Sequence, residues 1–270
     1  MSERKERNTQ VLKAALFGAT ALMLYAKISA GTLALYINPR FYWLPYIGFV
    51  ILLMLCASAV HQLIAPRQPD VIPLNALAHD AQALSPAAAH THPLPWWSIA
   101  LLLTPVVFGL LLPAAPLSAS ALNTRGLSSS APRRSLISNA QDLAGKKDRN
   151  ILDWLMLFGQ TQDPAALNSQ PLDVIGFVHL DPQRLAPGEF WVSRYIVTCC
   201  IADGSGVGMV ERLQAGGPPA GAASFKEGDW VRVRGQVVIG TLPGQGERMP
   251  VITARTIEGV DEPAQPYLFP

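Results

Sequence analysis

Three long apolar segments in the first 120 residues constrain this chain more than any other feature of its sequence. They cover about residues 11–37, 43–64 and 96–117, and each reaches the roughly 20 apolar residues that a membrane-spanning helix needs. Charged residues make up only 15% of the chain, whereas about a quarter is usual for soluble domains. We therefore expect residues 1–120 to form a transmembrane anchor of three helices in contact with the lipid bilayer.

The distribution of basic residues predicts how this anchor is oriented. Arg4, Lys5, Arg7 and Lys13 flank the first segment on its N-terminal side, whereas the first loop has only Arg40. Because cytoplasmic loops carry the excess of Lys and Arg, we expect the N-terminus in the cytoplasm. Three crossings would then place everything after about residue 120 on the extracytoplasmic side.

Lys27 lies near the middle of the first apolar segment. A lysine at the centre of a membrane helix costs about 2.5–3.5 kcal/mol on insertion scales. We therefore expect this intramembrane polar side chain to contact another protein helix or to extend toward the membrane surface.

Two stretches of the chain are interpreted as connections. Residues 65–95 are rich in Ala, Pro and His and predict a linker, in which a few side chains are weak candidates for metal binding: His79, Asp80, His90 and His92. Residues 121–170 predict a second linker that leads into a short helix at 151–159, where apolar side chains recur on one face.

From Leu172 onward the apolar pattern has the period of two that is typical of strands. Five strands are predicted, at residues 173–180, 190–202, 207–213, 229–240 and 250–260. The stretch "EGDWVRVRGQV" resembles a barrel strand that bends at a glycine. Residues 171–270 therefore predict a small antiparallel OB-like β-barrel, and the whole chain is expected to be an α+β membrane protein.

Cys199 and Cys200 are adjacent in the second predicted strand. Successive side chains on a regular strand point to opposite faces, so Cys199 would pack in the core with Trp191 and Tyr195. Cys200 would lie with Arg194 on the more polar face and be more available for chemistry.

Three interpretations of the cysteine pair stay open: two buried core residues, a metal or thiol site, or a disulfide. The metal hypothesis takes Cys199, Cys200 and Asp203 as ligands. The pair lacks the spaced pattern of a zinc motif, so the cofactor is left unknown, with a metal ion as the candidate.

The other predicted site is the exposed face of the fourth strand. Trp230, Arg232 and Arg234 alternate there with inward-facing valines, and Arg194 joins them as a candidate binding residue. The formal charge of +2 is too small to indicate a nucleic acid partner.

The sequence contains no pattern of an enzyme active site, such as ordered Ser, His and Asp residues or a phosphate-binding loop. His179, which is the only histidine after residue 120, is expected at a surface position of the first strand. We therefore expect that the protein is not an enzyme.

Four stretches resemble the YcgQ-like family of permease subunits: "DVIGFV", "FWVSRYIVTCCIADG", "GDWVRVRGQV" and "PYLFP". The most specific of them contains Arg194, Cys199, Cys200 and Asp203, although the family usually has alanine where this chain has Ile201. The resemblance implies a multi-pass protein of the bacterial plasma membrane. It also implies a partner, a multi-span permease encoded nearby.

Together these observations predict an accessory subunit of a membrane permease. Its extracytoplasmic β domain would bind a metal, a thiophilic species or the partner itself. Two alternatives stay open: a standalone membrane-anchored thiol or metal-binding protein, and an OB-like module that binds an extended ligand.

Overall fold

The computed structural model describes residues 2–64, 96–130, 143, 145–212, 225–242, 246 and 248–270. The chain divides into two compact units. Unit 1 comprises Met1–Leu33 and Tyr42–Ala114, and unit 2 comprises Ala34–Phe41 and Ala115–Pro270. The predicted linker at 65–95, with its histidines and Asp80, lies outside the described residues.

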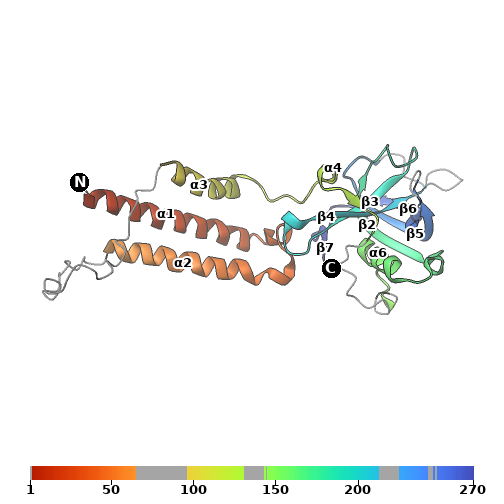
Figure 1. The fold of residues 1–270 in the computed structure, drawn as a ribbon, viewed down its shortest axis with the longest axis horizontal. Coiled ribbons are helices and arrows are strands. Elements are labelled where there is room, and N and C mark those ends of the chain that lie inside the picture. The colour runs from red at the N-terminus through yellow and green to blue at the C-terminus, as the bar shows by residue number, and fades with distance from the viewer. Residues whose placement is uncertain are drawn as a thin grey trace, which may run out of the picture. The chain divides into compact units, whose positions relative to one another are not determined.

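Unit 1 contains three helices, α1 (Ser2–Ser29), α2 (Trp43–Ile64) and α3 (Trp96–Leu111). α1 and α2 lie side by side and run in opposite directions (Figure 1), and the rings of Tyr25 and Phe49 are 5.9 Å apart between them. The C-terminal end of α3 lies beside the C-terminal end of α1, where a Cβ on Gly109 would meet the side chain of Met23.

Two of these helices are long and apolar enough to span a membrane, over Arg7–Ser29 and Pro39–Ile64, so the prediction of three spanning helices is wrong. α3 has 16 residues, which gives a length of about 24 Å against the roughly 30 Å of a bilayer core. Its helix ends at Leu111 because Pro113 and Pro116 follow and cannot continue the hydrogen-bonding pattern. The predicted extracytoplasmic position of the chain after residue 120 was based on three membrane crossings. With two spanning helices, that argument no longer holds.

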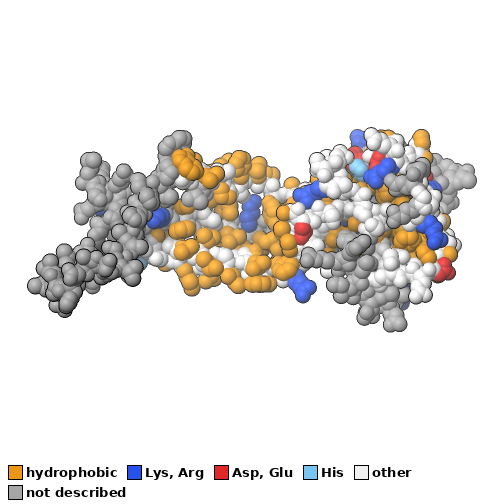
Figure 2. All heavy atoms as spheres, in the orientation of Figure 1, with side chains coloured by type: hydrophobic (Ala, Val, Ile, Leu, Met, Phe, Trp, Pro, Cys, Tyr) orange, Lys and Arg blue, Asp and Glu red, His pale blue; other side chains and the backbone are white. Residues whose placement is uncertain are grey.

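The helices of unit 1 expose much of their apolar surface (Figure 2). Leu22, Met54 and Leu111 are 66%, 67% and 74% exposed. A soluble monomer seldom exposes apolar patches above a few hundred Å². Such a surface fits contact with lipid or with the helices of another protein.

Lys27 lies in the last turn of α1 rather than at the centre of a span. The helix begins at Ser2 and ends at Ser29, so it is displaced toward the N-terminus relative to the predicted segment. The ammonium group donates to the carbonyl of Leu112 at 3.5 Å. A cation near the C-terminal end of a helix is also favoured by the helix dipole.

Unit 2 is built on a closed five-stranded barrel, in which each strand pairs with the next in the order β2–β3–β4–β6–β5 and β5 pairs with β2. Five strands are found where they were predicted, as β2 (Pro171–His179), β3 (Phe190–Ile196), β4 (Ser205–Glu211), β5 (Trp230–Thr241) and β6 (Arg248–Gly259). The prediction that the second strand continues to residue 202 is wrong, because β3 ends at Ile196. The expectation of a wholly antiparallel barrel is wrong at one pairing, because β4 and β6 run parallel. Two short strands, β1 (Leu127–Ser128) and β7 (Tyr267–Leu268), extend the sheet beside β4 and β3.

The predicted short helix is α6 (Ile151–Gln160), which begins at a capping box. The side chain of Asn150 accepts from the Asp153 backbone, and the Asp153 carboxylate accepts from the Asn150 backbone. The buried face of α6 packs into the barrel core, where Ile151 and Trp154 are almost fully buried. Shorter helical turns are η1 (Thr32–Leu35), η2 (Pro39–Phe41), η4 (Ala119–Ala121), α4 (Leu122–Arg125), η6 (Pro164–Leu167) and η7 (Ile201–Asp203).

The predicted glycine bend is confirmed in β5. The register between β5 and β6 shifts between Arg234 and Gly235. A Cβ on Gly235 would lie 2.1 Å from the carbonyl oxygen of Thr253, so no side chain fits where the two strands cross most closely. This bend lets the long strands curve around the barrel.

Candidate functional site

The cysteine pair lies in a turn between β3 and β4, not on a strand. β3 ends at Ile196, and the Asp203 carboxylate then accepts hydrogen bonds from the backbone N–H groups of Thr198 at 3.0 Å and Cys199 at 2.7 Å. This folds the chain back on itself, and the sulfur atoms of Cys199 and Cys200 are 3.7 Å apart. We name Val197–Asp203 the cysteine turn.

The expected difference between the two cysteines is therefore reversed. Cys199 is exposed and Cys200 is partly buried, and both are free thiols. The alternation of a regular strand no longer applies after Ile196, because the backbone N–H groups of Thr198 and Cys199 bond to the Asp203 side chain instead of to a neighbouring strand. Both sulfur atoms consequently lie close enough to bind one ion.

A segment from the loop between α1 and α2 holds the cysteine turn. The backbone N–H of Asn38 donates to the Cys199 carbonyl at 3.0 Å, and the backbone N–H of Ile201 donates to the Tyr36 carbonyl at 2.8 Å. The side-chain amide of Asn38 donates to the carbonyls of Val197 at 3.3 Å and Thr198 at 3.0 Å. Asn38 is only 7% exposed.

Sequence reasoning missed this contact. The only local signal is that Asn38 precedes Pro39, a pair that commonly begins a turn. The Asn38 side-chain oxygen indeed accepts from the backbone N–H of Arg40 at 3.0 Å. No local pattern indicates that its amide group reaches a turn some 160 residues away in the chain.

The electrostatics of the turn favour a protonated Cys199. The hydrogen bond to the Asp203 carboxylate, together with the neighbouring Cys200 thiol and slight desolvation, raises the pKa of Cys199 to about 11. For Asp203, partial desolvation raises the pKa, but the hydrogen bonds from Cys199 and the turn backbone lower it by more. A metal ion bound here would have to displace the Cys199 proton, so its affinity would increase with pH.

Among the described residues, no group of three or more His, Cys, Asp or Glu side chains is arranged to hold a metal ion. Both carboxylate oxygens of Asp203 accept backbone hydrogen bonds. The cysteine turn therefore offers a metal two sulfur ligands from this chain.

The four candidate binding residues separate into two groups. Arg194 is buried, donates to the Pro266 carbonyl at 2.9 Å and lies over the ring of Trp230 at 5.4 Å. Arg232 binds Asp173 through two hydrogen bonds of 2.7 and 2.6 Å, and Arg234 bridges Asp173 and Glu258. The two exposed arginines are thus engaged by carboxylates of neighbouring strands.

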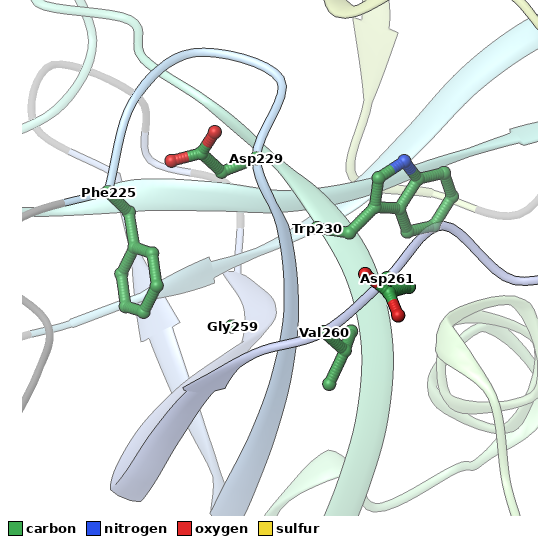
Figure 3. A pocket seen from close by; sticks show the side chains of 6 residues that line it. All are labelled: Phe225, Asp229, Trp230, Gly259, Val260 and Asp261. Atoms are coloured by element: carbon green, nitrogen blue, oxygen red, sulfur yellow. The ribbon is translucent and has the colours of Figure 1, made fainter.

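Trp230 also lines an open pocket of about 580 Å³. Figure 3 shows Phe225 and Asp229 on one side of it, with Trp230, Val260 and Asp261 on the other. The pocket combines two aromatic rings with two carboxylates, a lining that suits cations better than anions.

Two further polar residues are placed differently from what the sequence indicates. His179 is buried, not at the surface, and its Nδ1 atom lies 2.7 Å from the Glu227 carboxylate. Glu211 is fully buried at the end of β4, where the backbone of Ala254 lies near its carboxylate but neither oxygen has a well-formed hydrogen bond among the described residues. Burial is the main reason that the pKa of Glu211 is raised to about 7.

Comparison with known families accounts for nearly the whole chain. The DUF1980 N-terminal domain matches residues 12–128, and the DUF1980 C-terminal domain matches residues 144–270. The chain belongs to the DUF1980 family. The C-terminal DUF1980 domain contains α6, the barrel and the cysteine turn, and no curated protein matches the chain.

Proposed function

We propose that this protein is a membrane-anchored permease subunit that binds a thiophilic metal ion through Cys199 and Cys200. The observation that carries the metal assignment is the 3.7 Å separation of the two sulfur atoms. Two thiolates bound at about 2.3 Å to a tetrahedral metal are about 3.8 Å apart. The turn thus holds the sulfur atoms close to the spacing that a metal requires.

The same distance argues against a disulfide. A disulfide bond is about 2.05 Å long, so the sulfur atoms would have to approach by more than 1.5 Å from 3.7 Å. The hydrogen bonds from the Cys199 backbone to Asp203 and from Asn38 to the Cys199 carbonyl oppose the backbone movement that this requires. Metal binding needs no such movement.

The contacts of the α1–α2 loop support an extracytoplasmic cysteine turn. Residues 34–41 belong to unit 2 and also join α1 to α2. In a membrane-spanning hairpin, this loop emerges on the side opposite the N-terminus. Since the basic N-terminal residues favour the cytoplasm, unit 2 and its cysteines would lie outside.

The partnership with a permease rests on the resemblance to YcgQ-like subunits and on the exposed apolar faces of unit 1. Those faces offer a surface for the helices of a multi-span partner. In this arrangement the cysteine turn supplies two ligands, and cargo or partner groups complete the metal coordination. A metal held by two protein ligands exchanges more easily than one in a closed four-ligand site.

The alternative of an extended ligand on the exposed face of β5 has less support. Arg232 and Arg234 are engaged by Asp173 and Glu258. An incoming ligand would have to break these ion pairs before it could use either guanidinium group.

Titration of the purified full chain in detergent with Zn²⁺ and with Cd²⁺ tests the metal site. We expect one ion per chain, with binding lost in both Cys199→Ser and Cys200→Ser. Cys56→Ser is the matched control, because Cys56 lies in α2 and bonds to the Ala14 carbonyl. Unchanged stoichiometry in the two single variants would refute the site, and co-purification with the neighbouring permease tests the partnership separately.

A further inference from the structure

A buried cation in the barrel wall has no counter-charge among the described residues. Arg194 on β3 is only 8% exposed, and burial lowers its pKa to about 10. A buried ion carries a penalty of several kcal/mol unless an opposite charge accompanies it. The groups around Arg194 therefore indicate which ligand could balance its charge.

The known contacts of Arg194 are with neutral groups. Its guanidinium group donates to the backbone carbonyls of Gln265 and Pro266 and lies over the Trp230 ring. Among the described residues, no carboxylate lies within ion-pair distance of it. The two carbonyls accept hydrogen bonds from two of its nitrogen atoms. They are neutral, however, so they do not balance the positive charge of the guanidinium group.

Arg194 faces a cavity of about 250 Å³ in unit 2. The cavity is smaller than the roughly 300–1,000 Å³ of sites for drug-sized ligands. Its wall also contains Asn150, which is the N-cap of α6 and whose backbone N–H donates to the Asp153 carboxylate. The remaining lining residues are Asp148, Arg149, Asp173, Val174, Ile175 and Arg232.

The two carboxylates that line the cavity act on arginines other than Arg194. Three guanidinium groups line it, from Arg149, Arg194 and Arg232, against two carboxylates, from Asp148 and Asp173. Asp173 binds Arg232 and Arg234, and the charge of Asp148 acts on Arg232. Both carboxylates thus act on Arg232, at the exposed side of the cavity, and not on Arg194.

We propose that this cavity binds a small oxyanion, of the phosphate, sulfate or carboxylate class, as the counter-ion of Arg194. A guanidinium group presents a planar fork of N–H donors that matches two oxygens of such an anion. The small volume selects a compact ligand. The site shares no residue with the cysteine turn and does not depend on metal binding there.

The test is thermal unfolding of the full chain in detergent, with inorganic phosphate, sulfate or acetate added at constant ionic strength against chloride. We expect at least one of these anions to raise the midpoint, since a ligand that binds only the folded state stabilises it. Arg194→Gln should weaken the affinity by at least about tenfold, because it removes a charged hydrogen-bonding partner. Arg255→Gln changes an exposed arginine on β6 and should leave the affinity unchanged.

Because Arg194 also holds the segment before β7, its replacement could prevent folding. Asp173→Asn supplies an independent measurement: it removes a competing carboxylate and frees Arg232, so anion affinity should increase several-fold. The proposal is overturned if none of the three anions raises the midpoint of the wild-type chain. It is also overturned if Asp173→Asn leaves the anion response unchanged or weakens it.

Discussion

Asn38→Ala should loosen the cysteine turn, because one buried side chain joins the α1–α2 loop to it. The substitution removes two amide donors, to the carbonyls of Val197 and Thr198. Val197 is fully buried, so its unpaired carbonyl should cost about 1–3 kcal/mol. Thr198 is exposed, so water replaces that hydrogen bond and its loss should cost about 0.5–1 kcal/mol.

The sum is about 1.5–4 kcal/mol, which should lower the unfolding midpoint by roughly 3–16 °C in a unit of this size. Tryptophan fluorescence of the full chain in detergent measures this change, since Trp154, Trp191 and Trp230 all lie in unit 2. The matched control is Asn123→Ala, which changes an exposed asparagine of α4 and should not alter the midpoint.

The second assay is the binding of a trivalent arsenical, which needs both thiols of the pair. In a Cys56→Ser background, Asn38→Ala should weaken this binding, because the turn that sets the 3.7 Å sulfur separation then keeps only its backbone hydrogen bonds to the α1–α2 loop. A midpoint equal to that of Asn123→Ala would refute the stability argument. A lowered midpoint with unchanged arsenical affinity would show that Asn38 does not position the thiols.

Three other predictions follow from the structure. Gly235→Ala should destabilise unit 2 by about 3 kcal/mol or more, because its Cβ would lie 2.1 Å from the Thr253 carbonyl oxygen. The control Gly145→Ala should leave the thermal unfolding midpoint nearly unchanged, because a Cβ there would have no atom within 4 Å. Glu211 has a pKa raised to about 7, mainly by burial, so its neutral form stabilises the folded state below about pH 4.5 and this stability is lost as the pH rises to about 7. In Glu211→Gln, the unfolding midpoint should therefore depend less on pH across this range than in the wild type. An unchanged pH dependence of the midpoint would contradict the assignment. In Cys56→Ser cells, a membrane-impermeant maleimide should label Cys199 in intact cells, and labelling only after lysis would place unit 2 in the cytoplasm.

Local sequence patterns determined the elements of this fold. Apolar runs of sufficient length predict α1 and α2, and alternation with period two predicts all five barrel strands. The bend at Gly235 could be expected as well, because a glycine within an otherwise regular strand commonly marks a close backbone approach. Each of these features depends on residues that are neighbours in the chain, so a window of ten to twenty residues contains the information.

Only the tertiary structure decided how the chemical groups meet. The two cysteine sulfur atoms lie close together because the Asp203 carboxylate accepts hydrogen bonds from the backbone of Thr198 and Cys199. The side chain of Asn38, about 160 residues away in the chain, also donates a hydrogen bond to the same turn. The parallel pairing of β4 with β6 and the burial of Arg194 beneath the segment before β7 are likewise contacts between distant parts of the chain. Such hydrogen bonds form only after the barrel closes and brings these atoms within about 3 Å of each other. The periodicity of residues along the sequence therefore cannot predict them.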